Sequence, residues 1–204
     1  MKKKSLLTML VALTLVAVVG VGATLAYLSD STGTLTNTFT VGNGINIEQD
    51  ESDESTPDNP NDRTETGNDY TDIQPGDKLV KDPTVTIVKN STECYVFMKL
   101  TGADALAAQG FAFGGFDATK WIKADGLDTL DGVYRYYTTV AESAEDQKLA
   151  PLFTDVTYDI NAEELAEGVE LSDVIIQSCA VQAKNMTEAT AYDAAVETIT
   201  TPAE

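Results

Sequence analysis

Residues 93–101 read ECYVFMKLT, a run in which two apolar faces alternate. One face holds Cys94, Val96, Met98 and Leu100, and the other holds Tyr95 and Phe97. Side chains along a β-strand point alternately to the two sides of a sheet, so the pattern predicts a strand. Residues 84–88 have a similar β-branched character, and the KNST that follows at 89–92 predicts a hairpin between the two strands.

Similar runs occur along most of the chain. In residues 34–41, TLTNTFTV, threonines alternate with mostly larger apolar side chains, which predicts a half-buried strand, and the alternation resumes after Gly42-Asn43-Gly44 at Ile45 and Ile47. Short helices are predicted at residues 103–109 and from about residue 187 to 199. Further strands are predicted at residues 121–123, 133–140, 152–160 and 174–183. Many short strands separated by turns predict an all-β fold, a β-sandwich with short peripheral helices.

The first 26 residues have the three parts of a secretory signal peptide. MKKK at residues 1–4 is basic, residues 6–21 are mostly apolar, and ATLA at residues 23–26 supplies small residues for cleavage. We therefore expect a signal-peptide helix that is cleaved between Ala26 and Tyr27, followed by a single domain over residues 27–204. The alternative is an uncleaved membrane anchor, because residues 6–26 are long enough to span a bilayer.

The chain is strongly acidic, with 33 Asp and Glu residues against 13 Lys and Arg residues. Removing residues 1–26 takes away three lysines and no acid, which moves the formal net charge from −20 to −23. A field of this sign repels phosphates, so no nucleic acid is expected as a partner. We expect a secreted protein. It would contact the membrane only if its signal peptide stayed uncleaved.

Residues 48–72 concentrate this charge, with ten acids and the single base Arg63. Such a segment buries too little apolar surface to offset its ordering entropy, so we predict a flexible acidic insert within the sandwich domain. An EF-hand is not expected at Asp58, Pro60 and Asp62. Pro60 has no side-chain oxygen at the third position, and no glycine follows Asp62. A loose association of calcium with this segment stays open.

The residue types needed for common catalytic sites are missing. The chain has no histidine, which excludes Ser-His-Asp and Cys-His pairs and histidine-containing zinc sites. It has no P-loop and no GxGxxG pattern. We therefore predict no catalytic, cofactor-binding or metal site and no enzymatic activity. Cys94 and Cys179, the only cysteines, either form one disulfide in an oxidising exterior or are two buried small apolar residues.

Several segments, in order, resemble the TasA and camelysin family of Gram-positive bacteria. They are MKKK at residues 1–4, ATLAYLSD at 23–30, NTFTVGN at 37–43, QPGD at 74–77, KDPTV at 81–85, ECYVF at 93–97 and AVQA at 180–183. Each is short, and their order and spacing carry the resemblance over nearly the whole chain. The resemblance implies a jelly-roll-like antiparallel β-sandwich, a SipW-type signal peptidase that cleaves after Ala26, and a biofilm-matrix protein that assembles into fibres.

In TasA-like fibres the mature amino-terminal segment of one subunit completes the sheet of the next. The resemblance therefore implies a donor strand at residues 27–35 of this chain, with Tyr27, Leu28 and Leu35 as candidate apolar anchors. The alternatives are that this segment folds back on its own subunit or stays disordered.

Two other functions stay open beside a fibre subunit. One is a monomeric extracellular binding module. The other is a secreted metalloprotease, since camelysin-like members have been classed so, but the absence of histidine disfavours it.

Overall fold

Short strands form most of the regular structure in the computed structural model, which describes residues 43–55, 59, 62–162 and 169–200. The strands are β1 (Ile47–Ser52), β2 (Arg63–Thr64), β3 (Lys78–Val80), β4 (Thr84–Ile87), β5 (Cys94–Thr101), β6 (Phe111–Gly114), β7 (Trp121–Lys123), β8 (Gly132–Tyr136), β9 (Gln147–Lys148), β10 (Asp155–Tyr158) and β11 (Ile175–Gln182). The helices are α2 (Ala103–Ala108) and α3 (Glu188–Thr200). Gly42–Glu204 forms one compact unit.

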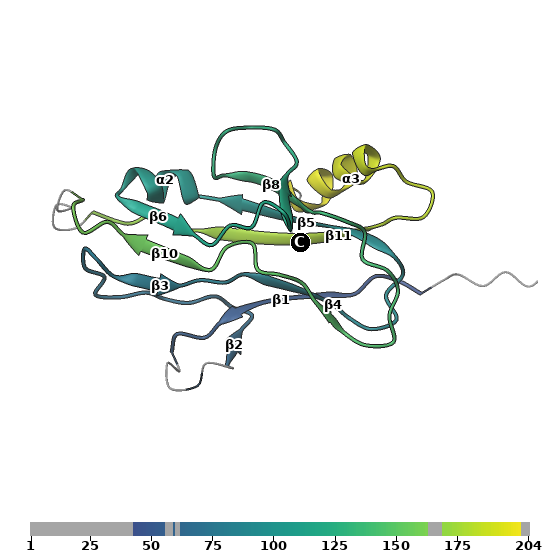
Figure 1. Ribbon diagram of the computed structural model, residues 1–204, viewed down its shortest axis with the longest axis horizontal. Coiled ribbons are helices and arrows are strands. Elements are labelled where there is room, and N and C mark those ends of the chain that lie inside the picture. Colours follow the sequence, from purple (N-terminus) through teal and green to yellow (C-terminus); the bar gives the residue numbers. More distant parts are fainter. Residues whose placement is uncertain (1–42, 56–58, 60–61, 163–168, 201–204) are drawn as a thin grey trace, which may run out of the picture. The chain divides into compact units, whose positions relative to one another are not determined.

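The strands pair in three antiparallel sheets, with orders β2-β1-β4-β9, β3-β10-β6 and β11-β5-β8-β7 (Figure 1). Pairs such as β4 with β9 and β5 with β11 join strands far apart in the sequence, as expected for a jelly-roll-like sandwich rather than a series of hairpins. The prediction of an all-β antiparallel sandwich with short peripheral helices is confirmed.

The main core lies between the sheet β11-β5-β8-β7 and the other two sheets. From β5 it takes the predicted face, Cys94, Val96, Met98 and Leu100, all fully buried. From the opposite sheets it takes Val85, Ile87, Phe111, Val156 and Tyr158. Burying this apolar surface is the main force that holds the sheets together.

The second face of β5 has a core of its own. Phe97 packs there with Val133 and Cys179, and α3 covers them with Ala191, Ala195 and Ile199. These helix residues recur at a spacing of four, so they share one side of α3. The predicted amphipathic helix is therefore confirmed, and it lies on the outer side of the sheet (Figure 1).

The predicted hairpin between residues 84–88 and 93–101 is wrong. Both strands form, but β4 pairs with β1 and β9, while β5 pairs with β11 and β8. Val85 and Ile87 of β4 belong to the same core as Val96 and Met98 of β5. Because each strand has an apolar face to bury, the two strands lie in opposing sheets and not side by side.

The prediction of a flexible acidic insert over residues 48–72 is wrong where this segment forms two strands, β1 and β2. β1 runs on to Ser52, and β2 pairs back onto it with Thr64 opposite Glu51. Residues 56–58 and 60–61 of this segment, which include Asp58 and Pro60, lie outside the described residues. The acidic composition did not indicate β1, because the inward-facing carboxylate of Glu51 is paired with Lys81, as described below.

Other predictions also fall outside the described residues. These are the signal peptide at residues 1–26, the cleavage position Ala26 and Tyr27, the donor strand with Tyr27, Leu28 and Leu35, and the strand at residues 34–41. Across the part of the chain that is described, no helix is long and apolar enough to span a membrane.

Candidate functional site: a groove beside an edge strand

Strand β11 lies at the edge of its sheet, with β5 as its neighbour on one side. The ladder continues past the strand end, where the Ala183 N–H donates to the Glu93 carbonyl at 2.9 Å. Antiparallel strands bond through alternate residues, so residues 175, 177, 179 and 181 face β5 with their backbone groups. The backbone groups of Ile176, Ser178, Ala180 and Gln182 therefore point to the free edge, where the described residues supply no further strand.

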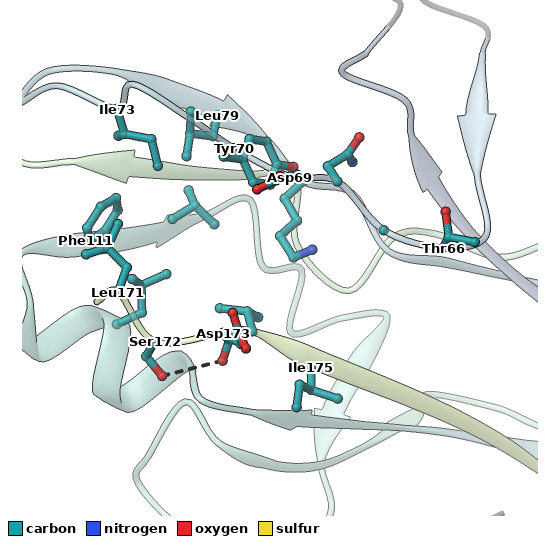
Figure 2. A pocket seen from close by; sticks show the side chains of 16 residues that line it. Thr66, Asp69, Tyr70, Ile73, Leu79, Phe111, Leu171, Ser172, Asp173 and Ile175 are labelled. Atoms are coloured by element: carbon teal, nitrogen blue, oxygen red, sulfur yellow. Dashed lines mark hydrogen bonds between the residues drawn. The ribbon is translucent and has the colours of Figure 1, made fainter. Parts of the chain in front are cut away.

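Two adjoining cavities open beside the first half of β11, and we call them together the edge groove. Their volumes are about 360 and 250 Å³. They share Thr66, Gly67, Lys81, Val174 and Ile175. In the larger cavity, Ile73, Leu79 and Tyr70 lie on one wall, and Leu171, Ser172 and Asp173 lie on the other (Figure 2).

A buried ion pair lies where the two cavities meet. The Nζ atom of Lys81 donates to the two carboxylate oxygens of Glu51 at 2.9 and 3.2 Å. The side chains of Glu51 and Lys81 are only 7% and 12% exposed. Asn68 also donates to Glu51 at 3.0 Å and to the Ser52 carbonyl at 2.8 Å. Both charges are therefore compensated inside the sandwich, as buried charges must be.

One wall of the edge groove, residues 66–70, is held by its own side chains. Asn68 accepts from the Glu54 N–H at 2.9 Å, and the Tyr70 hydroxyl donates to the Val80 carbonyl at 2.5 Å. Burial raises the pKa of Tyr70, and the carboxylates of Glu51 and Glu54 raise it further. The Tyr70 hydroxyl therefore stays protonated and remains a donor near neutral pH.

The opposite wall, residues 171–175, is fixed by Gln109 and Gly102. The Gln109 side chain donates to the Glu170 carbonyl at 3.0 Å and accepts from the Ser172 N–H at 2.9 Å. Gly102 has a φ of 87°, and a Cβ atom there would lie 1.9 Å from the Asp173 carbonyl oxygen. Only glycine allows this close approach of the two backbones. Gly102 therefore lets the residues that precede β11 pack against the start of α2.

Gln49 on β1 reaches across the open side of the sandwich to β11. Its Nε2 atom donates to the Ile176 carbonyl at 3.2 Å, and its Oε1 atom accepts from the Ser178 hydroxyl. The Ile176 carbonyl is one of the groups that point to the free edge. Gln49 is therefore a direct polar link between the two sheets on this side.

Arg63 of β2 binds residues on and beside the two neighbouring strands, β1 and β4. It bonds the carboxylates of Asp50 and Asp82, each at 2.7 Å, and also reaches the Thr84 hydroxyl at 3.1 Å. Burial alone would raise the pKa of Asp82, but hydrogen bonds from the Ser52 backbone and Arg63 outweigh it and lower the pKa below its ordinary value. These contacts hold β2 against β1 and β4.

Cys94 and Cys179 do not form the disulfide that was one of the two alternatives, and both thiols are free and buried. Cys179 lies opposite Phe97 in the β5–β11 ladder, so it faces α3. Cys94 faces the main core with Val96. The two cysteines are on opposite sides of one sheet, where their sulfur atoms cannot meet, and the alternative of two buried apolar residues describes them.

The sequence prediction missed the residues of the edge groove. The predicted flexible insert over residues 48–72 contains both Gln49 and Glu51, and no site role is predicted for them or for Lys81. The alternation that begins at Ile45 and Ile47 could have indicated two of them. Continued along the strand, it places Gln49 and Glu51 on the same inward side as these isoleucines.

Among the described residues, no group of three or more Asp, Glu, His or Cys side chains is arranged to hold a metal ion. Comparisons of the chain with models of known families, with curated proteins and with solved structures found no match.

Proposed function

We propose that this protein is an exported structural subunit of the cell surface or biofilm matrix that polymerises by β-strand addition. The free edge of β11 is the acceptor. The observation that carries the proposal is the row of outward-pointing backbone groups from Ile176 to Gln182, which lies beside the edge groove. Exposed edges of this kind bind extended segments through main-chain hydrogen bonds, and adjacent pockets take alternate side chains.

The position at which the chain enters the compact unit favours head-to-tail assembly. The Thr92 N–H donates to the Gly44 carbonyl at 3.1 Å, and Ser91 bonds the backbone of Asn46 at 3.0 and 3.1 Å. Gly44 therefore lies at the end of the sandwich where β11 finishes, while the edge groove lies where β11 begins. A contact between opposite ends of two copies does not close and extends into a filament.

The segment upstream is long enough for this contact. Residues 27–42 span at most on the order of 50 Å when extended, whereas the eight residues of β11 cover about 26 Å. Tyr27, Leu28 and Leu35 are the apolar side chains that we assign as anchors. Cleavage after Ala26 by a signal peptidase of the SipW type would release this segment, as expected for a TasA-like subunit.

Electron microscopy of chains with different amino termini tests the proposal. A chain beginning at Tyr27 should form fibres, and a chain beginning at Thr36 should not. A variant with Tyr27, Leu28 and Leu35 replaced by serine should assemble poorly, while the matched change of Ser29, Ser31 and Thr32 to alanine should have little effect. Fibres from the chain that begins at Thr36 would show that residues 27–35 are not the donor.

The acceptor strand is tested by Gln182→Pro. The Gln182 N–H points to the free edge, so a proline there removes no bond to β5, and the fold should be retained. Loss of fibres with an unchanged circular dichroism spectrum would support β11 as the acceptor. Unchanged fibre formation would argue against it.

A monomeric binding module is the second candidate, because the larger cavity has a volume within the range of small-molecule sites. Sedimentation of the chain beginning at Tyr27 over a concentration series separates the two functions. A constant monomer mass at all concentrations would favour the binding module.

A further inference from the structure

The side chain of Gln49 occupies a position that a neighbouring strand would need. A primary amide has one carbonyl acceptor and N–H donors, the same groups that a peptide unit uses in a sheet. Its donor is bound to the Ile176 carbonyl at 3.2 Å, and its acceptor is bound to the Ser178 hydroxyl. A strand that pairs with β11 along its full length must bond the Ile176 carbonyl itself.

The distance between the two strands gives a second reason. Cα atoms of β1 and β11 come within 8 Å of each other. Neighbouring strands in a sheet lie about 4.8 Å apart, so a strand lying between β1 and β11 needs roughly 9.5 Å. The two edges must therefore move apart by more than an ångström before a strand can enter, and the side chain of Gln49 bonds β11 across this gap.

We propose that Gln49 is a latch that holds the free edge of β11 closed until an incoming strand displaces its side chain. This inference rests on the proposed strand addition and concerns its control. The latch restrains a free subunit from binding strands of other proteins, which is the hazard of an exposed edge. An incoming strand of sufficient length replaces two side-chain bonds with a longer row of main-chain bonds.

Peptide binding to the compact unit tests the latch. The probe is a fluorescein-labelled peptide with the sequence of residues 27–41, titrated by fluorescence anisotropy into a chain that begins at Gly42 and so carries no donor segment. Gln49→Ala should bind the peptide about tenfold more tightly than the unmodified chain, because two hydrogen bonds no longer compete. Gln177→Ala is the matched control on β11, since its exposed side chain faces away from the groove, and it should bind like the unmodified chain.

Ser178→Ala keeps the test independent of the stability of the first variant. It removes one of the two bonds, so we expect binding about threefold tighter than that of the unmodified chain. Thermal unfolding of each variant confirms that it is folded.

Two results would overturn the inference, and they differ in meaning. Equal or weaker binding by Gln49→Ala, with clear binding by the unmodified chain, removes the latch but leaves strand addition supported. No binding of the peptide by any folded variant removes strand addition of residues 27–41, and the latch with it.

Discussion

Replacing Lys81 with methionine removes the ammonium group from the buried ion pair in the edge groove and keeps most of the side-chain length. Glu51 is then left with Asn68 as its remaining side-chain partner at 3.0 Å, in a position only 7% exposed. Breaking a buried pair in this way costs about 3–5 kcal/mol, because one charge stays desolvated without compensation. A unit of this size loses about 2–4 °C of Tm per kcal/mol, so Tm should fall by roughly 10 °C.

The matched control is Lys78→Met. Lys78 also pairs with a carboxylate, that of Asp155 at 3.3 Å, but its side chain is 64% exposed. Exposed pairs contribute at most about 1 kcal/mol, so this variant should unfold close to the unmodified chain.

Urea unfolding followed by circular dichroism gives the free energy of unfolding of each variant. The double variant Glu51→Leu with Lys81→Met removes both charges and should recover most of the loss, since apolar replacements of buried pairs are often neutral or stabilising. A loss below about 1 kcal/mol for Lys81→Met, equal to that of Lys78→Met, would refute the reasoning, because Glu51 would then be solvated in the folded protein.

Two further predictions concern acid stability and the thiols. Asp82 has a folded-state pKa below its ordinary value near 3.8. The stability that this carboxylate contributes is therefore present above that value and is lost as pH falls through the folded pKa. In acid unfolding below about pH 4, the stability of Asp82→Asn should fall less steeply than that of the unmodified chain. An equal slope for both chains would show that the hydrogen bonds from Ser52 and Arg63 do not lower the pKa of Asp82 in the folded protein. Burial, together with the Glu93 carboxylate, raises the pKa of Cys94 to about 11, and burial also raises the pKa of Cys179. Both thiols should therefore resist alkylation near pH 8 in the folded chain and react once the chain is unfolded in urea. A non-reduced mass lower by two hydrogens would contradict the free thiols.

Most strands could be predicted from alternation because it is a local property. Residues 93–101 show it clearly, since both faces of β5 are apolar and each is buried in a core of its own. The amphipathic spacing of α3 is likewise visible in the chain. Pairing could not be predicted in this way: β4 and β5 follow each other in the sequence, yet they lie in opposing sheets because their apolar faces pack against each other across the core.

The edge groove could not be predicted from the sequence, because it is formed by contacts between residues far apart in the chain. Glu51 looks like one acid among ten in residues 48–72, and only the approach of Lys81, thirty residues later, makes its burial tolerable. Gln49 meets Ser178 across more than one hundred residues, and no local pattern marks that contact. The sequence by itself determined the β-rich class, the strong negative charge and the absence of histidine. The tertiary structure alone decided which strands lie at sheet edges, which charges are buried, and on which sides of β5 and β11 the two cysteines lie, because each of these depends on which strands become neighbours.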